Sequence, residues 1–383
     1  MRMIPRLAVG LAVPLGMGAQ TPDPPRPTFD FSSVVFGNFQ MRTDSAAKFS
    51  TGGKPSSRFD IGRAYLTFRM PAGDRASIRV TTDIFQNTAA GYYAGWAVRL
   101  KYGILQYDVT KSLGGMEGLS AVARIGMLHT VVIEHVETFW PRWMGNAAVE
   151  QHGFFASADV GAASLFTFPA RWGEAYVTVT NGSGYTAAET DRFKDIAARA
   201  SITPFGDDDG IFRTFTITPW YYRGASASKF VLGGPGQLGA VSDGLRKDRR
   251  GLFVGLRDRR ITAGIEYAQR LEQIESGSNT AASARVVSDT TTTLRSAFAV
   301  LRPLELIRTT RSPLSVIARL DRFTLSDAQA RRNSYVVLGA LWDLTSRVTL
   351  ALDYQELSQS NPPATGATVL PTKTWFLHWV ATF

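Results

Sequence analysis

The sequence contains no cysteine and only four histidines among its 383 residues. The absence of cysteine excludes disulfide bridges, thiolate metal sites and cysteine nucleophiles. The scarcity of histidine leaves few positions for a metal site built from imidazoles. Beyond the N-terminal segment, no stretch reaches the roughly 18 consecutive apolar residues that a membrane-spanning helix needs. The rest of the chain is therefore either soluble or a β-barrel.

Positive charge is in excess, with a formal net charge of +10 at pH 7, but it is spread along the chain. Single Lys and Arg residues alternate with apolar ones, which favours a dispersed lining over a docking patch for nucleic acid. Denser basic clusters occur at 246–250 and 257–260. We assign the first to an outer loop and the second to a turn, where solvated charge or contact with lipopolysaccharide is expected. We predict no nucleic-acid partner.

The N-terminus has the order of an export signal. Arg2 and Arg6 precede the short apolar run Leu7–Met17, small residues follow, and the Pro-rich stretch Thr21–Pro27 comes next. The alternative, a buried N-terminal helix, fits poorly with that Pro-rich stretch. We predict a signal peptide at 1–19, a short periplasmic linker at 20–30 and one β-barrel domain at 31–383.

Alternation with a period of two residues recurs through the rest of the sequence. In Ala76–Ile84, for example, one face carries Ala, Ile, Val and Thr, and the other carries Ser, Arg, Thr and Asp. This period predicts an all-β chain whose strands each have one apolar face. The predicted segments lie near 31–41, 58–70, 74–85, 95–108, 118–128, 152–167, 172–181, 193–203, 211–222, 249–257, 259–271, 292–302, 312–325, 334–344, 346–357 and 373–383.

The connections between these segments alternate in length. Long polar connections such as 181–192 and 224–248 follow odd-numbered segments, and tighter ones such as Pro71–Gly73 follow even-numbered segments. Outer-membrane barrels have this asymmetry, with short periplasmic turns and long extracellular loops. A sheet in lipid must close, because unpaired backbone groups are costly in hydrocarbon. We predict a transmembrane antiparallel β-barrel of about 16 strands, wide enough for an aqueous channel.

The last segment ends on an aromatic residue. Trp375, Leu377, Trp379 and Phe383 share one face of the predicted strand. This pattern resembles the signal that the barrel-insertion machinery of Gram-negative bacteria reads, although an ordinary buried strand remains the alternative. We therefore expect export through the periplasm, insertion by that machinery, and a position among the lipids of the outer membrane.

Charged residues on the polar faces of the strands are candidates for the bore. Counting about 3.3 Å per residue from the periplasmic turns places most of them near mid-height. We predict a charged belt that prefers anions, while solvated lumen side chains without selective effect remain the alternative. The predicted pore-lining residues are Arg63, Arg79, Arg99, Lys101, Arg124, Arg295 and Arg319, with Glu266, Asp321 and Asp353 as acids.

Several short stretches follow one another along the chain, namely Leu100–Asp108, Arg124–Met127, Trp140–Arg142, Phe154–Gly161 and Val179–Gly182. Their order is similar to that in the phosphate-selective porin O and P family. The resemblance implies a 16-stranded channel, usually a homotrimer, whose third outer loop folds into the lumen. Phosphate-selective members carry basic residues, notably lysines, at that constriction.

The matching loop of this chain, 128–151, has no Lys. Its charged and titratable residues at the predicted constriction are Glu134, His135, Glu137 and Arg142, and Glu150 follows. We therefore predict a passive channel for small hydrophilic solutes, with small anionic solutes preferred. A channel strictly selective for phosphate or polyphosphate is the alternative.

Enzymatic patterns are weak in this sequence. The run His129–Glu137 lacks the spacing of HExxH and HxxEH zinc motifs. Ser157 follows His152 by five residues on one predicted strand, too far for a hydrogen bond. We predict no catalytic residue, metal or cofactor. A barrel-wall hydrolase and a secreted carbohydrate-binding β-sandwich are the alternatives from other classes.

Overall fold

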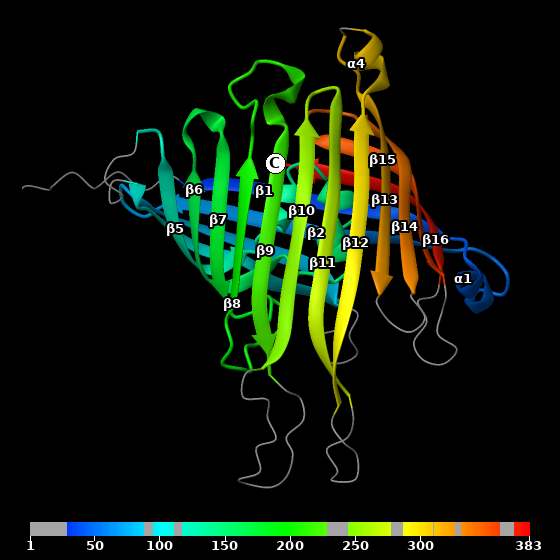
Figure 1. Ribbon diagram of the computed structural model, residues 1–383. Coiled ribbons are helices and arrows are strands. Elements are labelled where there is room, and N and C mark those ends of the chain that lie inside the picture. The colour runs from blue at the N-terminus through cyan, green and yellow to red at the C-terminus, as the bar shows by residue number, and fades with distance from the viewer. Residues whose placement is uncertain are drawn as a thin grey trace, which may run out of the picture.

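The computed structural model describes residues 29–87, 95–110, 117–227, 244–276, 286–308, 310–325, 331–360 and 371–383. The predicted signal peptide and most of the predicted linker lie outside these ranges. Within them the chain forms sixteen antiparallel strands in one closed barrel (Figure 1). The strands are β1 (Asp30–Arg42), β2 (Ser56–Pro71), β3 (Ala76–Asn87), β4 (Gly95–Asp108), β5 (Ser120–His129), β6 (Ala158–Thr167), β7 (Gly173–Thr180), β8 (Asp195–Ile202), β9 (Thr216–Ser226), β10 (Leu245–Arg257), β11 (Ile261–Ser276), β12 (Val286–Leu301), β13 (Leu314–Leu325), β14 (Arg332–Asp343), β15 (Val348–Ser360) and β16 (Thr372–Thr382).

The first and last strands close the barrel. β1 pairs with β16 from Val34 opposite Thr382 to Arg42 opposite Thr374. Every other strand pairs with its neighbour in sequence, so the sheet has no free edge. This confirms the predicted all-β fold of about 16 antiparallel strands. None of the helices in the described ranges is long and apolar enough to cross a membrane.

The two faces of the sheet differ as the period of two predicts. On β13, Ile317 and Arg319 are buried inside the barrel, whereas Val316 and Leu320 are exposed on its outer face. On β16 the outer face carries Trp375 and Leu377, which are also exposed. An outer face of exposed apolar side chains is suited to contact with lipid.

The connections differ between the two ends of the barrel. Those at 168–172, 258–260 and 344–347 are short, and they lie at the end that also carries α4 (Pro303–Ile307). Those at 43–55, which contains α1 (Ser45–Ser50), and at 181–194 are longer and lie at the opposite end.

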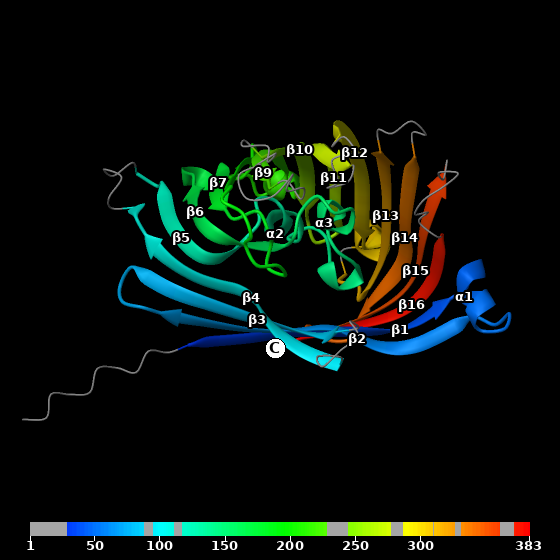
Figure 2. The same cartoon turned by 90° about the horizontal axis from the view of Figure 1, so that it is seen from below.

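The segment 130–157 between β5 and β6 folds into the barrel (Figure 2). It contains α2 (Ile133–Val136), a 3-10 turn η2 (Arg142–Met144) and α3 (Ala148–Gln151). We call it the inner loop. Its fully buried side chains pack against inward residues of β10, β12 and β14 in one apolar cluster, which includes Ile133, Trp140, Met144, Val149, Phe154, Phe253, Leu294 and Val337. Burial of each such side chain contributes roughly 1.5–3 kcal/mol to the stability of the folded protein, so the loop is firmly fixed to one wall.

A glycine makes the close approach of β4 and β5 possible. Gly126 has φ of 122°, in a region that favours glycine. A Cβ at this position would overlap the carbonyl oxygen of Gly103 on β4. The ladder between these strands therefore depends on Gly126.

We predict that Gly126→Ala destabilises the barrel by about 2 kcal/mol or more, because the energy of the strained backbone and the energy of the steric clash add together. Urea unfolding of refolded protein in detergent, followed by tryptophan fluorescence, measures this. Gly210→Ala is the matched control, since Gly210 has φ of −77° and a methyl group added there would have no atom within 4 Å. Equal midpoints for both variants would contradict the prediction.

Candidate functional site

The inner loop leaves a cleft of about 310 Å³ between itself and the wall formed by β1 to β5. Four cationic side chains, two carboxylates and a histidine line this cleft together with aromatic residues. They are Arg69, Arg79, Lys101 and Arg142, then Glu134, Glu137 and His129, and finally Phe36, Tyr65, Tyr102 and Trp143. The strand wall supplies most of the cations, and the inner loop supplies both acids.

Glu134 connects the inner loop to the strand wall. Its Oε1 lies 3.5 Å from Arg79 Nη1 and 3.0 Å from His129 Nε2, and its side chain is 44% exposed. Burial raises the pKa of this carboxyl, but the hydrogen bond with His129 and the charge of Arg79 have the larger, opposite effect and bring the pKa down to about 2. Glu134 therefore carries its negative charge at neutral pH.

Arg142 is held by acids of its own loop. Its guanidinium bonds to Glu137 and makes two hydrogen bonds to Glu150, of 2.6 and 3.0 Å. Burial lowers the pKa of Arg142, but these carboxylates outweigh burial and raise it above the ordinary value. Its Nε also lies 3.3 Å from the hydroxyl of Tyr65 on β2. Two carboxylates, Glu137 and Glu150, thus surround the single positive charge of Arg142 and exceed it by one.

Lys101 projects from β4 at the edge of the cleft. Its Nζ lies 3.2 Å from Ser157 Oγ and 3.4 Å from the Tyr65 hydroxyl, and 4.8 Å from the Tyr65 ring centroid. Within the described ranges no carboxylate forms a salt bridge with Lys101 or with Arg69. Among the described residues neither cation is directly paired with a carboxylate, although Glu137 and Glu150 interact with Lys101 at longer range.

A second cationic group lies on the inner face beside the cleft. Arg63 and Arg99 both bind the buried carboxylate of Asp83, at 2.7 and 2.8 Å. Arg124 on β5 lies 5.8 Å from the ring centroid of Tyr176. All three occupy the inner face, as the alternation predicts, but they do not line the cleft. Arg79 and Lys101 are the predicted wall cations that do.

The predicted residues of the later strands face inward but lie beneath the inner loop. Arg319 pairs with Asp321 at 2.7 Å and bonds to the carbonyl of Asn146 in the loop. Glu266 and Asp353 are 3% and 1% exposed. The sequence prediction that they line the bore is therefore wrong, because counting depth along a strand takes no account of what covers it. Arg319, through the carbonyl of Asn146, and Asp321, through His152, hold the loop to the wall.

Arg295 lies on the outer face, in contrast to the prediction. Its neighbours Leu294 and Ser296 are buried against the barrel interior, whereas Arg295 is exposed. The prediction assigned the apolar face of β12 to lipid. The inner loop reverses that assignment, because inward residues beneath it, such as Leu294, belong to an apolar core.

His135 is the predicted constriction residue that does not reach the cleft. Its Nε2 lies 2.9 Å from Thr218 Oγ1 on β9, and its ring packs against Phe139 and Phe253. Burial, with a further effect of Arg199, lowers the pKa of His135 to about 3. The residue is thus a neutral attachment point between loop and wall.

The aromatic lining of the cleft was not part of the predicted site. Tyr65 lies two residues after Arg63 on β2, and Tyr102 directly follows Lys101 on β4. The position of Tyr65 on the face of Arg63 was a usable signal. The position of Tyr102 gave no such signal, because it directly follows the inward Lys101 and alternation would place it on the outer face. A bulge between Thr81 and Thr82 in the β3–β4 ladder shifts the alternation there.

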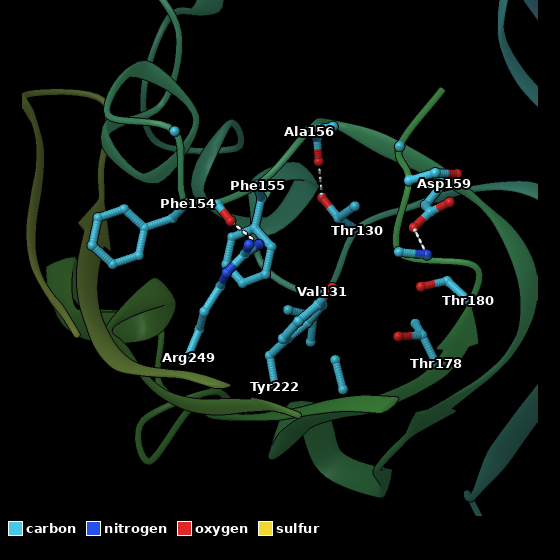
Figure 3. A pocket seen from close by; sticks show the side chains of 15 residues that line it. Thr130, Val131, Phe154, Phe155, Ala156, Asp159, Thr178, Thr180, Tyr222 and Arg249 are labelled. Atoms are coloured by element: carbon cyan, nitrogen blue, oxygen red, sulfur yellow. Dashed lines mark hydrogen bonds between the residues drawn. The ribbon is translucent and has the colours of Figure 1, made fainter. Parts of the chain in front are cut away.

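A smaller cavity of about 150 Å³ lies on the other side of the inner loop, near β6 to β10 (Figure 3). Its charged groups already have partners. The Asp159 carboxylate accepts hydrogen bonds from the backbone of Val160 and Gly182, and Arg249 bonds to Glu272 and to the carbonyl of Phe154. In the part of the chain that the structure describes, no three His, Asp or Glu residues are arranged to hold a metal ion.

We predict that stability falls as the pH drops from about 6.5 to about 3, because unfolded histidine binds a proton that His135 in the barrel does not. The contribution of His135 is at most about 1.4 kcal/mol per pH unit. His135→Gln removes this titration and keeps a polar group opposite Thr218. Urea unfolding at several pH values should give a shallower slope for the variant, and equal slopes would refute the assignment.

Comparisons with known proteins agree with the geometry at the level of the fold. No family model matches the sequence, and no curated protein matches it. Solved structures of outer-membrane proteins, porins among them, do match the fold. The in-vitro folded trimer form of OmpT from Vibrio cholerae has a TM-score of 0.58 at 9% identity, over 93% of this chain and 99% of that one.

Two further solved structures have similar values. The anion-selective porin from Comamonas acidovorans gives a TM-score of 0.57 at 11% identity, over 93% of this chain and 100% of that one. OprB from Pseudomonas putida gives a TM-score of 0.58 at 10% identity, over 93% of this chain and 94% of that one. The chain thus has the fold of an outer-membrane porin, and a match to the phosphate-selective porin O and P family is not found.

Proposed function

We propose that this protein is an outer-membrane channel through which small hydrophilic solutes and ions diffuse passively, with a preference for anions. The observation that carries the proposal is the cleft inside a porin-type barrel, which four cations and two carboxylates line. A polar cleft beside a closed β wall is suited to passage of water-soluble molecules.

The distribution of charge in the cleft supports anion preference. Glu134 offsets Arg79 and Glu137 offsets Arg142, while Glu150, which does not line the cleft, also bonds to Arg142. Lys101 and Arg69 exceed this one additional acid, so an excess of positive charge remains at the cleft. Charges in a narrow opening with walls of low dielectric constant act strongly on passing ions. The cleft should therefore hold anions more readily than cations.

Strict selectivity for phosphate or polyphosphate is the finer alternative. The sequence resemblance favours it, but the inner loop lacks lysine and the cleft has four aromatic residues. Such a lining suits a range of small anions, including organic ones. Competition separates the two cases, since phosphate blocks chloride current at low concentration only in a channel with a dedicated phosphate site.

A hydrolase of the barrel wall has one observation in its favour. Ser157 Oγ lies 3.2 Å from Lys101 Nζ, and serine with lysine is a known pair of nucleophile and base. Ser157 is 1% exposed, however, so a substrate has no access to its hydroxyl. Lipase and protease assays on refolded protein test this candidate, with Ser157→Ala as the control.

The same proposal includes the surroundings of the channel. The protein is exported through the periplasm of a Gram-negative bacterium, inserted by the barrel-insertion machinery, and surrounded by outer-membrane lipid and lipopolysaccharide. We also propose a homotrimer, which the trimer form of the similar OmpT supports. Chemical cross-linking of the protein in native membranes tests the oligomeric state.

We predict that Arg79→Ala combined with Arg124→Ala shifts the reversal potential in a salt gradient toward cation preference. The reason is the loss of positive charge at the cleft and beside it. Planar-bilayer recordings measure the shift, and Arg250→Ala on the outer face is the matched control. Cation selectivity of the wild type, or an unchanged reversal potential in the double variant, would contradict an anion-preferring belt.

We also predict that Phe383→Ser slows assembly into the outer membrane. Phe383 is exposed at the end of the outer apolar row of β16, as an insertion signal requires. The fraction of heat-modifiable, folded protein in the outer-membrane fraction measures assembly. The neighbouring change Thr382→Ser should leave this fraction unchanged, and equal assembly of both variants would show that the terminal aromatic is not read.

A further inference from the structure

Three arginines stand together on the outer face of the barrel, where most neighbours are apolar. Arg295 on β12 lies directly opposite Arg322 on β13, and Arg332 begins β14. Arg295 and Arg322 are exposed between buried neighbours, which places them on the outer side of the sheet. Like charges opposite each other destabilise a strand pair, so their arrangement calls for a reason.

Other charged side chains nearby have hydrogen-bond partners, whereas these three guanidinium groups have none among the side chains that the structure describes. On the inner face, Arg319 pairs with Asp321. On the outer face of β10, Arg250 bonds to the side-chain oxygen of Gln269 at 2.9 Å. Over the described residues, Arg295, Arg322 and Arg332 have neither a carboxylate nor a side-chain acceptor within hydrogen-bond distance. They are available to an external anion.

A hollow of about 550 Å³ surrounds these arginines. Besides the three guanidinium groups, hydroxyl side chains line it, namely Thr293, Thr324, Ser334 and Ser360. The register aligns Thr293 with Thr324, and Arg332 with both Thr324 and Ser360. Planar guanidinium groups with adjacent hydroxyls are suited to the oxygen atoms of a phosphate group.

The residues of the hollow lie at the same height along the barrel on the neighbouring strands β12, β13 and β14. Toward the α4 end, the outer positions are apolar, with Ala297 on β12, Leu320 on β13 and Val336 on β14. The next outer positions are Arg295, Arg322 and Ser334, which the register aligns. Such a common boundary marks where hydrocarbon ends and headgroups begin, because exposed arginine is unfavourable within hydrocarbon.

The opposite end of the same wall is consistent with this boundary. The exposed Leu304, Leu306 and Ile307 of α4 extend the apolar surface beyond the ends of β12 and β13. The apolar band therefore begins at α4 and ends at the arginines. Their hollow belongs to the barrel end that carries the longer connections. In outer-membrane barrels the long loops are extracellular, so the hollow would lie at the outer leaflet.

We propose that Arg295, Arg322 and Arg332 form a binding site for the phosphate group of an outer-leaflet lipid headgroup. The lipid chains would lie along the apolar positions of β12 to β14, and the phosphate would bind the guanidinium groups and hydroxyls. The site is separate from the cleft and does not depend on what the channel conducts.

A second copy of the chain is the competing occupant of this surface. It would have to offer acidic groups to three arginines. Outer-face carboxylates on neighbouring strands are already engaged, since Asp289 pairs with Arg246 and Glu356 with Lys373. A phosphorylated lipid matches both the charge of the hollow and the apolar surface next to it.

Native mass spectrometry of the full-length protein in neutral detergent tests the proposal, with bisphosphorylated lipid A as the probe. The test variant is Arg295→Gln, Arg322→Gln and Arg332→Gln combined. The control carries Arg260→Gln, Arg308→Gln and Arg311→Gln, which change the same charge at exposed positions of the opposite end. Heat-modifiable gel mobility confirms that each variant is folded.

We expect the affinity of the test variant for lipid A to be lower than that of the wild type by a factor of about ten or more, because charge-assisted bonds to phosphate are strong. The control should bind lipid A like the wild type. Dephosphorylated lipid A should bind wild type and test variant equally weakly. Displacement of lipid A by millimolar inorganic phosphate alone would point to a site for free phosphate and overturn the lipid assignment.

Three further results would also overturn the proposal. They are equal loss in test and control variants, unchanged binding in the test variant, and a change of oligomeric state without any change in lipid binding. The last result would assign the surface to contact between copies. Channel conductance is expected to be the same in the test variant and the wild type, so the outcome is independent of the proposed transport function.

Discussion

The structure depends on the closure of one hydrogen-bonded ladder between β1 and β16. In hydrocarbon every backbone donor and acceptor must be paired within the protein, so an open sheet is not stable there. Closure in turn fixes two faces for every strand, one toward lipid and one toward the interior. The exposed Trp375 and Leu377 and the buried His378 on the same strand follow from this single requirement.

The inner loop changes what the interior face must be. Where it packs, inward positions such as Phe253 and Leu294 are apolar, and the barrel has a hydrophobic core on that side. Where it does not pack, inward positions carry Arg79 and Lys101, which line the cleft. The barrel interior is therefore part core and part polar passage, and Glu134 of the loop is held at the boundary by Arg79 of the opposite wall.

Period-two alternation was sufficient to predict the number and order of the strands and the outer row of β16, because lipid imposes one simple rule on every strand. It extended the strand β6 back to 152, into the inner loop, and began β10 four residues late. It also predicted the inward positions of Arg63, Arg79, Arg99 and Arg124. It failed at Arg295, because a loop from distant sequence made the inward positions of β12 apolar. Arg319 and Glu266 do face inward, but the same loop covers them, so they do not line the bore. The inward course of the loop came from a family resemblance, since no local pattern specifies which wall a loop covers.

Cysteine accessibility in single channels tests most directly whether the cleft is the ion path. The natural sequence has no cysteine, so single replacements can be modified without background. We predict that a bulky thiol reagent sharply reduces the current of Glu134→Cys, whose side chain faces the cleft, and leaves that of Leu352→Cys on the outer face unchanged. Unchanged current in modified Glu134→Cys, or block of Leu352→Cys, would contradict this account.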